Sequence, residues 1–439
     1  MPFMHPRLVP TTRRFLGWDT VVGGAAFQAL QAALVFQSFG IYVVAWSDEF
    51  GWARAAIAAG YAVATVQSGL LGPIHGALLD RFGVRRVMSV GLVVLAAGLL
   101  SLSVMTTLPT YYAAMLLTGL GLALSGFLSI TTAIVPWFVR RRSTAVSLMS
   151  VGISLGGLLV PLVAAAVVGL GWRSMLQLGA TIVLAVGLPC ITLMRRQPAE
   201  YGQEPDGPER PGRPRSMPRR GRAGGPDLTL QEALRTRAFW LLGVGHAAAL
   251  LVGSAVTVHL IAHLTGSLDY TVQSAAQVIA LVTIISAIGQ LLGGPIGDRF
   301  AIHKVAAIAM VAQAIGLVVL ARAGGAPAVV VFALLHGLAW GIRGPLMGSV
   351  RADYFGTRHF GAIMGASMTV FMVGDLLGPI LAGTLADLLG DYRIGFTVVA
   401  LIAASASIAF WFATPPAARS GLDASSTPPP GPTPPSAEG

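Results

Sequence analysis

Apolar residues run along this chain in long blocks separated by short polar connections. A bilayer core of about 30 Å needs about 20 apolar residues in a helix, and twelve blocks reach that length. The pattern predicts helical segments over 20–46, 55–79, 87–106, 109–136, 144–169, 172–194, 238–264, 272–297, 305–323, 327–354, 359–388 and 392–414. The fold class predicted is therefore an all-α integral membrane protein with twelve transmembrane helices.

A charged stretch occurs twice, with an offset of 218 residues. One copy runs from Gly76 to Arg86 between segments 2 and 3, and the other from Gly294 to Lys304 between segments 8 and 9. The same offset relates Gly119 to Gly337, Gly126 to Gly344, Gly156 to Gly374 and Pro161 to Pro379. Small residues let helices approach closely in lipid, so the repeat predicts two pseudo-symmetric six-helix bundles that can rock about a central site.

Composition supports the membrane class and excludes several others. The chain is 54% hydrophobic and 11% charged, with a mean hydropathy of +0.73, whereas soluble domains carry about 25% charged residues. A single cysteine, Cys190, excludes an internal disulfide. No phosphate-binding loop, H-E-x-x-H or G-x-S-x-G motif occurs, so neither an enzyme nor a resident cofactor or metal is expected.

The distribution of cations predicts the topology. Of 29 Lys and Arg residues, 24 lie in the tails and in the connections on one side of the membrane. The opposite loops hold Arg54, Arg173, Arg322 and Arg393, and Arg343 lies within a segment. Positive loops stay in the cytoplasm. The expectation is thus a multi-pass protein of the cytoplasmic (inner) membrane with both termini inside. The +11 charge then reports lipid contact and topology, and no nucleic-acid partner is expected.

The domains follow from these segments. We expect a cytoplasmic tail over 1–19, bundles over 20–194 and 238–414, a cytoplasmic linker over 195–237, and a disordered tail over 415–439. The linker from Arg195 to Gly225 is rich in Pro, Gly and Arg, which predicts disorder. Thr229 and Glu232 then form a capping-box pattern, which opens a short amphipathic helix.

The repeated stretch resembles the G-x-x-x-D-R-x-G-x-R-R loop of the major facilitator superfamily. The matching residues are Gly76, Asp80, Arg81, Gly83, Arg85 and Arg86, with Asp298 and Arg299 in the degenerate second copy. The resemblance covers essentially the whole chain outside the linker and tails. It implies alternating access, with this loop latching the cytoplasmic side in the outward-open state. Physically, Asp80 can cap the next helix or lie at the amino end of a neighbouring helix, where negative charge is favoured.

Other stretches resemble the bacterial monocarboxylate-transporter-like and oxalate–formate-antiporter-like branch of that superfamily. They are 49–54, 137–142, 230–240 and 353–361. The resemblance implies transport of small carboxylates, often with a proton. Segments 8 and 11 lack the basic residues by which members of known carboxylate binding hold their substrates, so two-point recognition of a dicarboxylate is not expected. Met115 replaces the segment-4 arginine of proton-coupled members.

Arg343 is the leading candidate for substrate binding. It lies about sixteen residues into segment 10, where a cation costs several kcal/mol unless it is paired or faces a wet cavity. The resemblance implies that segments 1, 4, 7 and 10 line the cavity, so Arg343 can bind a substrate carboxylate. Alternatively, it holds backbone carbonyls or Asp353 near the cytoplasmic end. Gln28 and Gln31 of segment 1 and His336 of segment 10 are further candidates.

Three residues are candidates for proton coupling. Asp375 is the only acid well inside a segment, and burial favours the neutral form of a carboxyl group. A structural ion pair between Asp375 and Arg343 is the alternative. His259 and His263 lie one turn apart in segment 7, where they can relay a proton, contact substrate or simply lie at the membrane interface. A metal site lacks a third ligand.

The hypothesis from sequence is a secondary transporter for a small organic anion, most simply a monocarboxylate, in symport with a proton. One chain is expected to suffice for a complete pathway. The alternatives are an efflux carrier for amphipathic compounds, or a non-transporting membrane sensor.

Overall fold

The computed structural model describes residues 14–206 and 227–416, and these ranges contain helices and no strand. The N-terminal half comprises α1 (Gly17–Gln31), α2 (Phe39–Phe50), α3 (Arg54–Leu70), α4 (Gly72–Phe82), α5 (Val84–Ser103), α6 (Leu108–Ser125), α7 (Phe127–Ile134), α8 (Arg142–Leu158), α9 (Val160–Leu170) and α10 (Trp172–Thr192). The C-terminal half comprises α11 (Leu230–Leu234), α12 (Arg237–Ser267), α13 (Val272–Arg299), α14 (Ile302–Ala321), α15 (Ala326–Phe355), α16 (Phe360–Leu389) and α17 (Tyr392–Phe412).

Within the described residues, eleven helical spans are long and apolar enough to cross a membrane, and α3 with α4 forms a twelfth that bends by 53°. Several N-terminal spans are broken. A π-helical turn over Ala32–Phe36 separates α1 from α2, and Pro73 and Pro161 lie in the first turns of α4 and α9. A proline there lacks an N–H and clashes with the preceding turn, which breaks the helix. The predicted twelve-helix fold is confirmed.

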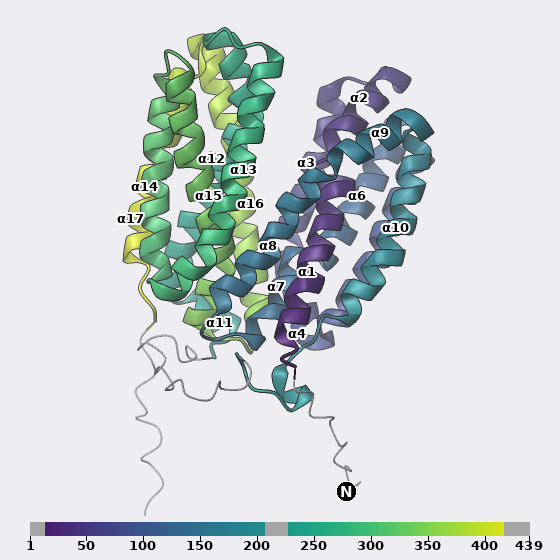
Figure 1. The fold of residues 1–439 in the computed structure, drawn as a ribbon, viewed down its shortest axis with the longest axis vertical. Helices are drawn as coiled ribbons and strands as arrows, with labels where there is room; N and C mark the ends of the chain where they lie inside the picture. The colour runs from purple at the N-terminus through teal and green to yellow at the C-terminus, as the bar shows by residue number, and fades with distance from the viewer. Residues whose placement is uncertain (1–13, 207–226, 417–439) are drawn as a thin grey trace, which may run out of the picture.

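The two halves form two bundles, each with a hydrophobic core, and the N-terminal core also includes Ala352, Phe360, Met364 and Phe371 of the C-terminal half. In Figure 1 the bundles converge at the end where α4 and α11 lie, and diverge toward the opposite end. Two helix pairs form most of the junction: α4 packs on α16, and α8 packs on α13. These pairs are related by the 218-residue offset, so the internal repeat places two equivalent contacts at one end of the molecule.

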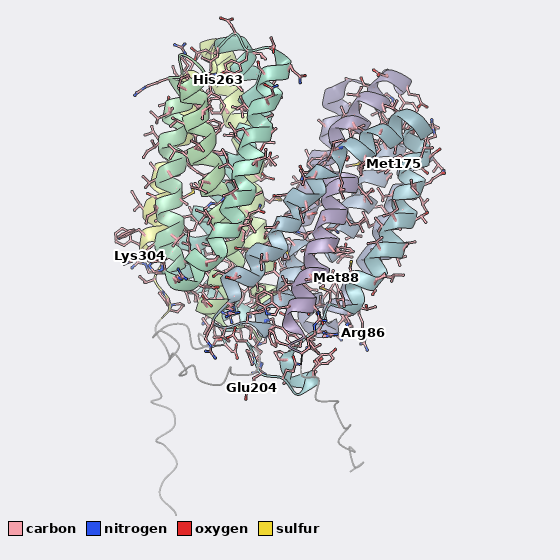
Figure 2. All side chains as sticks on the ribbon, in the orientation of Figure 1. Arg86, Met88, Met175, Glu204, His263 and Lys304 are labelled. Carbon is pink, nitrogen blue, oxygen red and sulfur yellow. The ribbon has the colours of Figure 1, made fainter. Side chains whose placement is uncertain are left out.

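Charged residues gather at the converging end. Arg86, Glu204 and Lys304 lie there, while His263 lies at the diverging end (Figure 2). We call the converging end the linker face.

The expected disorder from Arg195 onward needs correction for residues 195–206. This stretch contains a 3-10 turn over Pro198–Tyr201. Trp137 Nε1 donates to the Arg195 carbonyl at 3.0 Å, and Gln203 Oε1 accepts the Leu16 N–H at 3.0 Å. Side-chain hydrogen bonds to specific loops outweigh the Pro-rich and Arg-rich composition here. Residues 207–226 and both outer tails, 1–13 and 417–439, lie outside the described residues. The capping box at Thr229 and Glu232 is confirmed.

Candidate functional site

The spacing shared by the two copies of the repeated loop has a geometric basis at the linker face. The Asp80 carboxylate, at the end of α4, accepts the backbone N–H groups of Gly361 at 3.2 Å and Ala362 at 3.0 Å. Those N–H groups belong to the first turn of α16 in the other bundle, where helical donors have no intrahelical acceptor and the helix dipole favours an anion. Asp80 thus lies at the amino end of a neighbouring helix, the second of the two placements considered from sequence.

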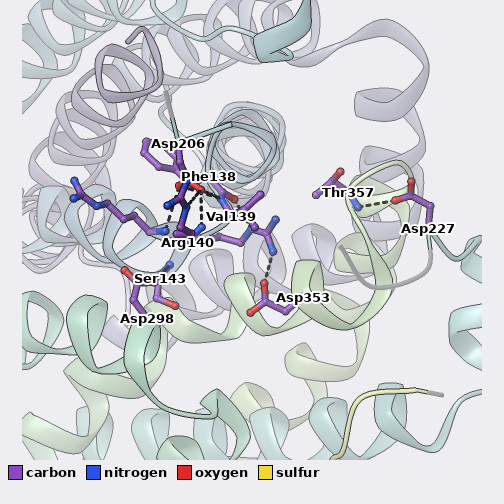
Figure 3. A network of polar contacts seen from close by, with 11 residues as sticks. Phe138, Val139, Arg140, Ser143, Asp206, Asp227, Asp298, Asp353 and Thr357 are labelled. Carbon is purple, nitrogen blue, oxygen red and sulfur yellow. Dashed lines mark hydrogen bonds and ion pairs between the residues drawn. The ribbon is translucent and has the colours of Figure 1, made fainter. Parts of the chain in front are cut away.

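The second copy of the loop makes the same contact in reverse. Asp298, at the end of α13, accepts the backbone N–H groups of Ser143 at 3.0 Å and Thr144 at 3.2 Å, and the Thr144 hydroxyl at 2.5 Å. Subtracting 218 from 361 and 362 gives 143 and 144, so the acid and its receptor turn repeat together. We call these two contacts the latch. Figure 3 shows Asp298 beside Ser143.

Glycines allow the latch helices to touch. A Cβ atom added to Gly76 would lie 2.0 Å from the Gly361 carbonyl oxygen, and one added to Gly72 would lie 2.4 Å from the Gly365 carbonyl oxygen. Only glycine permits such close approach of two backbones. Gly76 therefore determines how closely α4 can pack on α16.

An ion pair between the bundles was not predicted. Arg142 at the start of α8 pairs with Asp353 near the end of α15, and both side chains are buried, at 5% and 9% exposure. Arg142 Nε also donates to the Phe138 carbonyl at 2.9 Å. The offset places Val135 and Phe360 at the equivalent positions, so this contact has no copy. No ion pair between Asp353 and Arg343 is found among the described residues.

Each end of the linker is fixed to the loop that precedes α8 or α16, the two helices whose first turns bind the latch acids. On the N-terminal side, the Asp206 N–H donates to the Trp137 carbonyl at 2.8 Å, and its carboxylate accepts the N–H groups of Val139 at 3.2 Å, Arg140 at 2.8 Å and Arg141 at 3.3 Å. Asp206 has a φ of 65°, a left-handed conformation that Asp tolerates better than most residues. Figure 3 shows this clamp around Asp206.

The C-terminal end of the linker repeats this arrangement. Leu228 N–H donates to the Phe355 carbonyl at 3.0 Å, and the Asp227 carboxylate accepts the N–H groups of Thr357 at 3.0 Å and Arg358 at 3.2 Å. The acceptor and donors at 355, 357 and 358 are 218 residues after those at 137, 139 and 140. We call the two arrangements the linker clamps.

The remaining residues of the loop motif are structural. Gly83 has a φ of 81°, which a side chain would strain. Arg85 Nη2 donates to the Thr192 carbonyl at 2.6 Å and ties the loop to α10. Arg81 lies over the Phe82 ring at 5.3 Å, and Arg86 is exposed. Arg299, in the last turn of α13, completes the second copy.

Arg343 is completely buried in α15, with 0% exposure. Its guanidinium carbon lies 5.1 Å from the centroid of the half-buried Trp340 ring. Among the described residues, none accepts a hydrogen bond from Nε or Nη1, and none forms an ion pair with this side chain. The predicted alternative of a pair with Asp375 therefore does not occur in this conformation.

A second buried arginine in the same helix was missed from sequence. Arg351 is 1% exposed. Its Nε donates to Ser367 Oγ on α16 at 3.0 Å and its Nη1 to the Met347 carbonyl at 2.7 Å, while no described residue accepts from Nη2. Arg351 falls near the end of predicted segment 10 and was not among the candidate residues, because it lies only four residues from the end of α15. Its position eight residues after Arg343 was the available signal.

His246 of α12 lies with these arginines. Its ring stacks on Phe371 of α16, with centroids 4.0 Å apart, and the Arg351 guanidinium lies 4.7 Å from the same Phe371 ring. Both Arg343 and Arg351 interact electrostatically with His246. Helices α12, α15 and α16 thus bring two cations and one imidazole together inside the C-terminal bundle.

The other substrate-binding candidates do not join Arg343 directly. Gln31 Nε2 donates to Ser125 Oγ on α6 at 2.9 Å, inside the N-terminal bundle, and Gln28 is buried on α1 one turn away. His336 lies on α15 but points toward α14, where its Nδ1 is 3.5 Å from Gln313 Nε2. His336 also stacks on Trp340, with centroids 6.4 Å apart, and interacts electrostatically with Arg343.

The proton-coupling candidates are dispersed. Asp375 is half-buried on α16, and no described residue forms an ion pair with it; it interacts electrostatically with Tyr61 of α3 in the other bundle. His259 Nε2 lies 2.9 Å from the Pro379 carbonyl of α16. His263 Nε2 lies 3.2 Å from the Leu320 carbonyl of α14. The two histidines therefore contact different helices and form no common site. No cluster that could hold a metal was found among the described residues.

Comparisons with known proteins agree with this architecture. The Major Facilitator Superfamily model matches residues 25–263 and 242–436. Monocarboxylate transporter 13 of Bos taurus is 29% identical over 399 residues, which cover 87% of this chain and 86% of that protein. Agnestins efflux protein AgnL12 of Paecilomyces divaricatus is 28% identical over 320 residues, covering 71% and 67%. The crystal structure of the transporter FucP in the outward conformation superposes with a TM-score of 0.68 at 17% identity, over 91% of this chain and 98% of that one. The chain therefore belongs to the Major Facilitator Superfamily.

Proposed function

We propose that this protein is a secondary transporter that moves a small carboxylate, in the simplest case a monocarboxylate, together with a proton by alternating access. The observation that carries the proposal is Arg343, a buried cation for which the described residues provide only the Trp340 ring. A buried charge without a partner is costly, and a substrate carboxylate can supply two acceptors in the fork geometry that a guanidinium favours. The likeness to a protein named as a monocarboxylate transporter supports the same substrate class.

The latch supports alternating access. Both copies of the contact close the linker face, and Figure 1 shows the bundles apart at the other end. In this proposal the linker face is cytoplasmic, as the cation distribution predicts, so the described conformation is outward-open. Opening of the linker face requires both latch contacts to break. One chain holds both bundles and suffices as a monomer.

Asp375 is the proposed proton carrier. It is a half-buried acid that interacts with Tyr61 across the interface between bundles, so its surroundings change when the bundles rock. His259 and His263 are weaker candidates, because each Nε2 lies within hydrogen-bond distance of a backbone carbonyl.

Uptake into proteoliposomes tests the proposal. Labelled monocarboxylates are supplied with and without an inward proton gradient, to the unmutated protein and to Arg343→Ala. Gradient-driven uptake that falls at least about a hundredfold in Arg343→Ala is expected, since a charge-assisted pair is lost. Arg322→Ala, which removes an exposed arginine, is the matched control and should transport normally. Uptake that survives in Arg343→Ala would assign that arginine a structural role.

Efflux of amphipathic compounds is the second candidate, favoured by the likeness to a protein named as an efflux protein. The absence of uptake for every carboxylate, together with proton-driven export of an amphipathic dye, would support it.

A further inference from the structure

We propose that Arg351, His246 and Phe371 form a second anion subsite, on the linker side of Arg343, through which the transported carboxylate passes when the linker face opens. The inference rests on the proposed function, because its occupant is the carboxylate first held by Arg343. It adds a site that the sequence analysis did not anticipate.

The two arginines are ordered along the transport direction. Helix α15 ends at Phe355 beside the linker face, where Asp353 pairs with Arg142. Arg351 follows Arg343 by eight residues, about 12 Å along a helix axis. A carboxylate that leaves Arg343 toward the linker face therefore moves toward Arg351.

His246 connects the two positions. It interacts electrostatically with both arginines, and its ring stacks on Phe371, which also lies against the Arg351 guanidinium. His246 Nδ1 and Arg351 Nη2 are both buried, and no described residue makes a hydrogen bond with either atom. Each of these unpartnered nitrogen atoms can donate to a carboxylate oxygen as the anion passes, provided that Nδ1 carries its proton.

Charge points to an anion as the occupant. Within residues 14–206 and 227–416, no carboxylate forms an ion pair with Arg351. Ser367 and Met347 satisfy only two of its nitrogen atoms. A purely structural arginine would gain from acceptors at every donor, since each buried donor left unsatisfied costs stability. An anion that binds transiently would accept a hydrogen bond from the third nitrogen atom, Nη2.

The latch couples this subsite to opening. Helix α16 carries Ser367 and Phe371, and its first turn carries Ala362, which donates to Asp80. A movement that withdraws Ala362 from Asp80 therefore acts on the helix that holds the subsite. Release of the latch and access to Arg351 from the linker face are parts of the same motion.

The experiment measures KM from each face separately. Intact cells present the face opposite the linker, and everted membrane vesicles present the linker face. The probe is the labelled monocarboxylate that the unmutated protein transports best. Arg351→Gln is expected to raise KM at the linker face about tenfold and to leave KM at the opposite face within about twofold. Arg343→Gln is expected to raise KM at both faces. Arg358→Gln, an exposed arginine near the same end, is the matched control and should change neither.

Three outcomes would overturn the inference. An equal rise of KM at both faces in Arg351→Gln means one shared site. An unchanged KM at both faces with a lower unfolding temperature means a structural cation. An unmutated protein that transports no carboxylate removes the proposed function as well. If Arg351→Gln does not fold, Arg351→Lys keeps the charge without the planar fork, and a linker-face KM that it leaves unchanged contradicts the proposal equally.

Discussion

The Asp80 carboxylate accepts the backbone N–H of Ala362 at 3.0 Å, so an acid of one bundle caps a helix of the other. Asp298 caps the equivalent helix at Thr144 in the reverse direction. The two bundles therefore hold each other at the linker face through reciprocal contacts between carboxylates and helix termini, whose strength depends on geometry at both ends.

Replacing the latch acids should shift the conformational equilibrium. Asp80→Asn and Asp298→Asn each remove a negative charge from a helix amino end, which is worth about 1–2 kcal/mol. Each variant is expected to raise the ratio of linker-face-open to linker-face-closed molecules about five- to thirtyfold. The distance between the two bundles at the linker face can be measured with spin labels at positions 86 and 304. Arg86 and Lys304 are exposed and occupy equivalent positions in the two bundles (Figure 2). Glu204→Gln is the control, and an unchanged distance distribution in both latch variants would contradict the assignment.

Removing one charge of the buried pair between Arg142 and Asp353 should cost more stability than removing both. Arg142→Ala leaves the Asp353 carboxylate without this partner and is expected to destabilise the closed linker face by about 3 kcal/mol. Arg142→Met combined with Asp353→Leu removes both charges and should restore much of the loss. Thermal unfolding and the same spin-label distance measure both variants. If the double variant is as impaired as the single one, the pair has a role beyond charge compensation.

The close contact at Gly76 predicts a steric block. In Gly76→Ala the added methyl group would overlap the Gly361 carbonyl oxygen, so α4 and α16 must separate and the latch cannot close. Initial transport rates are expected to fall at least about tenfold with normal folding, since packed backbone does not deform cheaply. Gly169→Ala is the control, because nothing lies within 4 Å of its added Cβ. Full activity in Gly76→Ala would show that this contact is dispensable.

Asp375→Asn separates coupling from transport. An asparagine side chain cannot release a proton, so uptake should no longer respond to a proton gradient, while exchange of labelled for unlabelled carboxylate continues. The ratio of uptake with and without the gradient should fall to about one. Asp387→Asn changes an exposed acid of the same helix and should leave the ratio intact. A gradient response that persists in Asp375→Asn would transfer the coupling role to another residue.

The fold and the latch acids could be predicted because their signals are local and repeated. Apolar blocks of bilayer length predict spans, and the offset between Asp80 and Asp298 predicts two bundles with equivalent ends. The Arg343 position could be predicted as well, since a cation deep in an apolar block is conspicuous. The groups around Arg343 could not be predicted, because the positions of Trp340 and His246 relative to it depend on how α12 and α15 rotate about their axes.

Residues near helix ends were misjudged for the same reason. Arg351 resembles a loop cation by sequence, yet its long side chain extends back along α15 into the bundle, as helical side chains do. Asp206 ends a stretch whose composition predicts disorder, and its order comes from three backbone N–H groups in a loop 65 residues or more away. Composition describes a segment's average tendency and carries no information about such partners.

The linker clamps have a consequence for how the protein can be divided. Asp206 is fastened within the N-terminal half and Asp227 within the C-terminal half, so neither clamp depends on the backbone that joins them. A cut between these residues would leave every hydrogen bond of both clamps inside its own fragment. Two half-chains produced together would then assemble through the latch and the pair between Arg142 and Asp353, as a two-subunit protein with the same contacts between its bundles.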